Sequence, residues 1–201
     1  MRVTSPVDWY AVRAAGIVAY LLLSGVVILG LALAGKERLP RWPRFALEDV
    51  HRFGGLLVGS FIGLHVVTLA LDAYVPFSLV DLVVPFASSF RPVWTAAGVV
   101  ALELTAALAL TNRYRSRLSY RFWRRAHYVN FAVWVAATAH GLGAGTDTGL
   151  PWILIFYLPA IGAVAALTLR RALRRREFLS DVKPALRSRR LDAVTDPRSR
   201  P

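Results

Sequence analysis

The chain has 201 residues, of which 56% are hydrophobic, yet it carries a formal net charge of +13. A mean hydropathy of +0.46 excludes an ordinary soluble globular domain and indicates a membrane protein whose charges lie in loops and tails. The absence of cysteine excludes disulfides, iron–sulfur clusters and thiolate or covalent CxxCH attachment of a haem.

A basic loop separates the first two apolar segments. At about 1.5 Å per residue, Ala14–Ala34 is long enough to cross a hydrocarbon core of about 30 Å. The second predicted span runs from about Val50 to Ala73. Four cations between the two spans place this loop in the cytoplasm: Lys36, Arg38, Arg41 and Arg44.

The rest of the chain predicts three further spans. Residues 74–92 are apolar but broken by prolines, so we expect an interfacial or re-entrant segment on the outer side. The remaining spans are Val93–Leu110, His127–Leu142 and Pro151–Leu169. The predicted fold is therefore an all-α polytopic transmembrane helix bundle of five spans, with 74–92 as a short sixth element. Residues 171–201 form a basic tail, for which we expect a short helical extension followed by disorder.

The distribution of charge predicts the orientation. The loops at 35–46 and 112–125 and the tail hold nearly all the Lys and Arg residues. The opposite connections carry only Asp72, Asp81, Asp147 and Arg91. By the positive-inside rule, the N-terminus lies outside and the C-terminus in the cytoplasm of a multi-pass protein of the inner cell membrane. The basic charge thus reflects topology in the lipid bilayer, and we expect no binding of nucleic acid.

All four histidines of the chain lie in the second and fourth predicted spans. One crossing separates these spans, so they run parallel. This places His51 level with His127 near the cytoplasm, and His65 level with His140 toward the outside. Ionisable side chains at membrane depth are costly and usually functional, and a neutral imidazole is a strong axial ligand of haem iron. Each level therefore suits bis-histidine ligation of one porphyrin.

Two alternatives remain for the histidines. They can be four buried side chains that form hydrogen bonds with their neighbours. They can also form a transition-metal pathway, but such a pathway needs carboxylates beside the histidines, and these are missing. The helical geometry also poses a question. At about 100° per residue, His51 and His65 share one helix face, whereas His127 and His140 differ by roughly 140° in a straight helix. Either the fourth span is tightened or supercoiled, or its two haems lie on different flanks.

The histidine spacing carries a family resemblance. His-x13-His followed one span later by His-x12-His resembles the ferric reductase-like transmembrane domain, as do the segments RFWRRAHY and VPFASSFRPVW. This domain is shared by ferric reductases, NADPH oxidases and the haem-binding membrane subunit of bacterial methionine sulfoxide reductase systems (MsrQ/YedZ-like). The resemblance covers about residues 47–170 and implies a cytochrome b domain at 1–170 with a basic cytoplasmic tail at 171–201.

The resemblance also implies a function. It implies two b-type haems, with His51, His65, His127 and His140 as axial ligands of the iron. The chain would pass single electrons across the membrane, from a flavoprotein or quinol donor to an outer protein or small-molecule acceptor. Family members commonly have six spans, and no flavin and nicotinamide domain is recognisable here. We therefore expect an electron-transfer subunit of a two-component reductase. The alternatives are a quinol-oxidising haem subunit that anchors a periplasmic reductase, and a haem or metal transporter.

Four further residues are candidates for contact with the cofactors. Haem propionates need cationic partners, and Arg124 and Arg125 flank the inner level while Arg91 lies near the outer one. For Arg124 and Arg125, the positive-inside rule is the alternative explanation. Trp134 follows His127 by seven residues and lies between the two levels, where it can sit between the porphyrins or serve as a packed aromatic.

Overall fold

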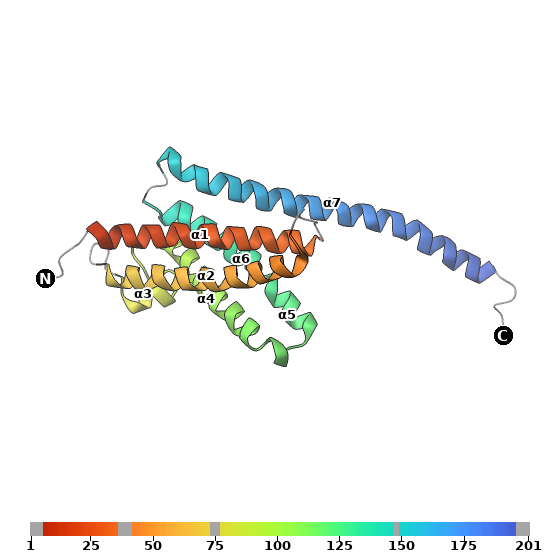
Figure 1. Ribbon diagram of the computed structural model, residues 1–201, viewed down its shortest axis with the longest axis horizontal. Coiled ribbons are helices and arrows are strands. Elements are labelled where there is room, and N and C mark those ends of the chain that lie inside the picture. The colour runs from red at the N-terminus through yellow and green to blue at the C-terminus, as the bar shows by residue number, and fades with distance from the viewer. Residues whose placement is uncertain (1–5, 36–41, 73–76, 147–148, 196–201) are drawn as a thin grey trace.

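The computed structural model describes residues 6–35, 42–72, 77–146 and 149–195, with side chains only between residues 10 and 176. Every regular element within these ranges is helical, which confirms the all-α prediction. Most of the helices run along one common direction, and the last helix leaves the bundle (Figure 1).

Helices α1 (Pro6–Ala34) and α2 (Arg44–Leu71) pack against each other along most of their length (Figure 1). Both begin earlier than predicted. Proline suits the first turn of α1, because the N–H that it lacks would have no partner there. Pro43 precedes α2 with an extended backbone, φ −68° and ψ 147°. His51 therefore lies about two turns inside α2 and not at its end.

The segment between the second and third predicted spans contains only the short helix α3 (Leu79–Val83). Ser78 and Asp81 form a capping box at its start, and the hydrogen bonds from Ser78 hold the pKa of the Asp81 carboxyl below its usual range. Residues 77–91 thus do not span, as predicted, while 73–76 lie outside the described residues. Arg91, with a positive φ of 42°, turns the chain into the next helix.

A helical hairpin follows. It consists of α4 (Pro92–Arg113), the single turn η1 (Arg115–Arg117), α5 (Tyr120–His127) and α6 (Asn130–Ala144). The predicted fourth span is split, because α5 ends at His127 and α6 has only 15 residues. A straight crossing needs about 20 residues.

Within the described residues, four helices are long and apolar enough to span a membrane: Tyr10–Ala34, Arg44–Leu71, Pro92–Arg113 and Pro151–Arg176. By length and composition, the predicted fourth span does not qualify, so five spans are not confirmed. Figure 1 shows α6 returning through the bundle from α5 to the start of α7, packed against α4 and α1.

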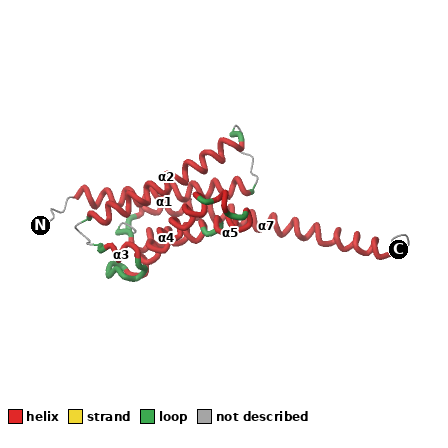
Figure 2. Tube along the Cα trace, turned by 90° about the horizontal axis from the view of Figure 1, so that it is seen from below, coloured by secondary structure: helices red, strands yellow, loops and turns green. Residues whose placement is uncertain are grey.

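Helix α7 (Pro151–Thr195) has 45 residues and continues well past the predicted fifth span. The helical extension is longer than we expected for the basic tail. It projects away from the bundle, as both overall views show (Figures 1 and 2). Residues 196–201 lie outside the described part of the chain.

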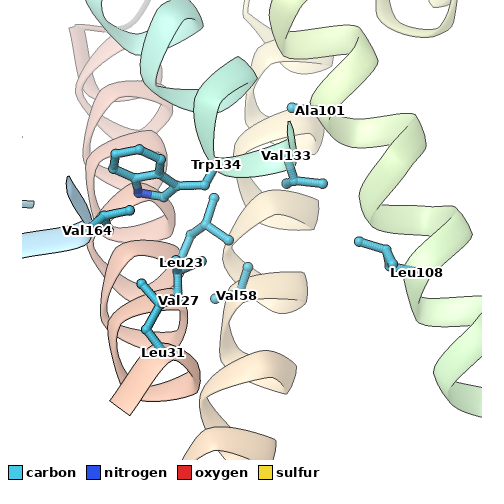
Figure 3. Packing of buried hydrophobic residues seen from close by; sticks show 9 residues of the cluster. All are labelled: Leu23, Val27, Leu31, Val58, Ala101, Leu108, Val133, Trp134 and Val164. Carbon is cyan, nitrogen blue, oxygen red and sulfur yellow. The ribbon is translucent and has the colours of Figure 1, made fainter. Parts of the chain in front are cut away.

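The main apolar core joins five helices around Trp134 and Val133 (Figure 3). It consists of Leu23, Val27, Leu31, Val58, Ala101, Leu108, Val133, Trp134 and Val164. α2 contributes only Val58 to this cluster. In the most apolar stretch of α2 only 6% of the residues are buried, against 33% in that of α1. The reason is that α2 packs closely only against α1 and α3. The inner face of α2 is thus separated from α4 and α6.

Candidate functional site

Two pairs of imidazole rings bridge the separation between α2 and the α5–α6 segment. The ring centroids of His51 and His127 are 6.1 Å apart, and those of His65 and His140 are 6.3 Å apart. The ring planes in the two pairs cross at 67° and 75°. The histidines that the sequence placed at equal depth are therefore neighbours in space, at two levels of the bundle.

A tightened turn between α5 and α6 brings both rings of this segment toward α2. The backbone N–H groups of Tyr128, Val129 and Phe131 each donate to the carbonyl three residues earlier, at 3.1, 2.9 and 3.1 Å. Such 3₁₀ geometry turns the chain by about 120° per residue instead of about 100°. Over three or four residues the gain is roughly 60–80°, about half of the mismatch between His127 and His140. Of the possibilities raised by the sequence, tightening is the one observed.

Backbone carbonyls orient the outer pair. Nδ1 of His65 lies 2.9 Å from the Val12 carbonyl oxygen on α1, and Nδ1 of His140 lies 2.9 Å from the Trp94 carbonyl oxygen on α4. Because a carbonyl oxygen can only accept, Nδ1 must carry the proton in both rings. Each Nε2 therefore keeps its lone pair, which is the form of imidazole that binds a metal.

A glycine four residues after each of these carbonyls makes the approach possible. A Cβ atom added to Gly16 would lie 3.1 Å from His65 Nδ1, and one added to Gly98 would lie 2.5 Å from His140 Nδ1. In a helix, the carbonyl of residue i accepts from the N–H of residue i+4, and its second lone pair stays available. A side chain at i+4 would cover this lone pair, so the glycine opens the carbonyl to the imidazole.

Helix α1 repeats the same arrangement at the inner level. Gly30 lies against His51, where an added Cβ would be 3.1 Å from the ring. Gly30 follows Val26 by four residues, as Gly16 follows Val12. The two valine–glycine pairs are 14 residues apart, which is also the spacing of His51 and His65. The Val26 backbone is close to Nδ1 of His51, but this buried atom forms no hydrogen bond of good geometry with any described residue.

The fourth ring, His127, is held differently. The Trp123 ring stacks on it, with centroids 5.3 Å apart and planes 24° apart. The side-chain amide of Asn130 donates to the His127 carbonyl at 2.8 Å and lies 3.3 Å from Nδ1. The inner pair thus has fewer well-formed hydrogen bonds to its ring nitrogens than the outer pair.

A cavity of about 270 Å³ surrounds the outer pair. Its wall includes both imidazoles and residues of α1, α4 and α7 on either side of the line that joins them. Ligand sites commonly enclose about 300–1,000 Å³, so this volume lies just below that range. Arg13 contributes a cation to the wall one turn before Gly16. Sequence reasoning missed Arg13, because residues 1–13 were taken as a polar flank and not as the start of a helix.

The other predicted residues occupy varied positions. The Arg91 guanidinium donates to the carbonyls of Gly143 and Gly145 at 2.7 and 3.1 Å and so ties the start of α4 to the end of α6. Trp134 points away from α2, and its Nε1 donates to Ser24 Oγ at 2.9 Å (Figure 3). Trp134 therefore has a packing role in the core.

Arg124 and Arg125 are exposed on α5. Contacts of Arg91, Arg124 and Arg125 with propionates remain predictions, as does contact of Trp134 with a porphyrin. Gly55, Gly59 and Gly63 of α2 have no atom within 4 Å of an added Cβ, so none of the described helices packs on these glycines.

The helices and the paired imidazoles define a multi-pass membrane protein with two stacked histidine sites. Residues 15–138 match the family model of the ferric reductase like transmembrane component. The match covers more than half of the chain, which therefore belongs to this family. It includes His51, His65 and His127 and ends just before His140. The family is typically haem-binding. The comparisons with curated proteins and with solved structures gave no significant match.

We predict that Gly98→Ala displaces His140, because the new methyl group would lie 2.5 Å from Nδ1. The purified variant should bind less haem than the wild type, as measured by its absorbance at equal protein concentration. Gly162→Ala is the matched control, since an added Cβ there has no atom within 4 Å. Equal haem content in the two variants would contradict the role of the glycine.

Proposed function

We propose that each histidine pair holds one b-type haem, so that the chain is a membrane cytochrome b with two bis-histidine haems. The distance between the rings is the observation that carries this proposal. Two metal–nitrogen bonds of about 2 Å each, together with the distance from each nitrogen to its ring centre, add up to roughly 6 Å between centroids. The observed 6.1 and 6.3 Å fit this sum.

The grouping of the ligands favours haem over a directly bound metal ion. No group of three or more His, Cys, Asp or Glu side chains that could hold a metal occurs among the described residues. Two opposed imidazoles leave four positions of an octahedral iron to be filled by something else, and a porphyrin supplies four nitrogens in one plane. This argues against the alternative of a metal transporter.

Haem, when bound, supplies an iron that accepts and releases one electron at a time. The chain's own part is to orient the ligands, keep water away and place the two levels in series. His51 and His65 are 14 residues apart on one helix, a rise of roughly 21 Å across the bundle. We infer that the chain is the membrane subunit of a two-component reductase in the inner membrane. A cytoplasmic flavoprotein or a quinol gives electrons, and an outer acceptor takes them. Arg13, in the wall of the outer cavity, is a further candidate to meet a propionate.

Two haems per chain are expected. A pyridine haemochrome assay on the purified protein should give two haems, and His65→Ala or His140→Ala should each reduce the value to one. The remaining haem should keep a six-coordinate spectrum in both variants, because the inner pair stays intact. A wild-type value of one or none would contradict the assignment. If a variant loses both haems, its haem content should be compared with that of His51→Ala. Loss of both haems in that variant too would indicate global misfolding.

We infer that the chain crosses the membrane five times, with α6 as the fourth crossing. A reporter that is active only in the cytoplasm should therefore work when fused after Arg176 and fail when fused at Gly149. The two positions lie at opposite ends of the candidate span Pro151–Arg176 within α7, so the test needs only this one crossing to be correct. The reverse pattern would overturn the orientation and exchange the inner and outer labels of the two sites.

A further inference from the structure

The end of the bundle beside His127 carries an unusual concentration of arginines and aromatic rings. We use the term hairpin surface for the segment from Asn112 to Tyr128. It contains six arginines and no acidic residue: Arg113, Arg115, Arg117, Arg121, Arg124 and Arg125. All six are exposed. Four aromatic side chains between them are also exposed: Tyr114, Tyr120, Phe122 and Tyr128.

Trp123 connects this surface to the inner histidine pair. One neighbour of its ring is the His127 imidazole, which it stacks at 5.3 Å, and another is the Arg115 guanidinium, also 5.3 Å from the ring centroid. Its Nε1 donates to the side-chain oxygen of Asn112 at 2.9 Å, which fixes the indole. A continuous series of contacts therefore leads from an exposed cation through an aromatic ring to a proposed iron ligand.

Helix α7 adds to the same side of the molecule. Arg171 donates to the hydroxyl of Tyr128 at 3.3 Å, so the basic end of the bundle and the basic helix meet next to α5. Beyond Arg176 the helix extends away from the bundle (Figure 2). Long-range positive potential from both elements would attract an acidic partner toward the hairpin surface.

We propose that the hairpin surface docks an acidic soluble protein that carries a one-electron donor such as a reduced flavin, and that Trp123 positions His127 for electron input. This inference rests on the proposed function. In each docking event one electron leaves the donor and reduces the ferric iron at the inner site, so the donor is oxidised by one electron. The partner then dissociates, as weak redox complexes do.

The composition of the surface favours a protein over lipid head groups. Positive loops near a membrane attract anionic lipids through charge alone. The hairpin surface combines arginine with tyrosine and tryptophan, the residues that dominate binding energy in protein interfaces. Tyr120 is 66% exposed and Phe122 54% exposed, which leaves them available for contact. Stacking of Trp123 on His127 links this surface to the inner histidine pair, a link that binding of lipid head groups does not require.

Binding to a flavodoxin, an acidic FMN-containing protein, tests the docking surface without any electron transfer. Wild-type protein in nanodiscs of zwitterionic lipid should bind the oxidised probe with a micromolar Kd that weakens steeply with salt. The double variant R117Q/R121Q should bind about 10-fold more weakly at low salt. R44Q/R52Q is the matched control, because it removes two exposed cations of α2, outside both the hairpin surface and α7, and should bind like wild type.

A second measurement tests Trp123 through the haem. Photoreduced flavodoxin should reduce the haem about 10-fold more slowly in Trp123→Leu and near the wild-type rate in Trp123→Phe, whereas dithionite should reduce all three equally. Binding of the oxidised probe should change little in either variant. A shifted low-spin EPR signal in Trp123→Leu alone would mark the change in His127 orientation. An unshifted signal with unchanged rates would contradict the positioning role.

Each outcome of the binding test bears on the docking surface alone. Equal weakening of the two double variants would mean general attraction to positive charge and would overturn the proposal. If R117Q/R121Q binds flavodoxin like wild type but attaches less to anionic lipid, these arginines belong to the membrane surface. That result would overturn the docking proposal as well. Failure of dithionite to reduce any haem would instead contradict the proposed function, since binding of the oxidised probe does not depend on it.

Discussion

The hydrogen bond between an imidazole N–H and an open helix carbonyl is the interaction on which the site depends. In the apolar interior of a membrane, a polar nitrogen without a partner is costly, and water is not available to supply one. His65 and His140 meet this requirement with carbonyls that already belong to the helical ladders of α1 and α4. Only a glycine one turn later leaves such a carbonyl accessible. The position of each ring, its tautomer and the direction of its free lone pair all follow from this contact.

The same contacts explain the arrangement of the helices. α1 must lie close to α2, because it provides glycines for both His51 and His65. α2 in turn stays apart from α4 and α6, since the facing imidazoles and the cavity occupy the space between them. A cofactor that binds both rings of a pair would join the two sides of the bundle. Ligands that bind only the folded state stabilise it, so loss of the cofactor should loosen α2 first.

Much of this organisation could be predicted from the sequence. Apolar length identified the long helices, and the matched positions of the histidines predicted which rings lie together. The histidine spacing raised a tightened fourth span as a possibility, but the place of the tightening could not be predicted, because Tyr128–Phe131 are residues with no strong helix-breaking tendency. The sequence did not indicate that Arg91 bonds the end of α6 or that Trp134 faces Ser24, and contact of either residue with a cofactor stays a prediction. The sequence contains a glycine four residues after Val12 and another four residues after Val26. The role of these glycines becomes apparent only from the antiparallel packing of α1 on α2, which places them against His65 and His51.

In the proposed function, the two imidazoles of each pair would hold one haem between them, and their ring planes cross steeply. Low-temperature EPR of the oxidised protein measures this most directly, because near-perpendicular imidazole planes on low-spin ferric haem give a highly anisotropic signal. With planes crossing at 67° and 75°, both haems should give such a signal, and Gly98→Ala should remove the outer component alone. A high-spin signal from protein that carries its full load of haem would contradict axial ligation by these histidines.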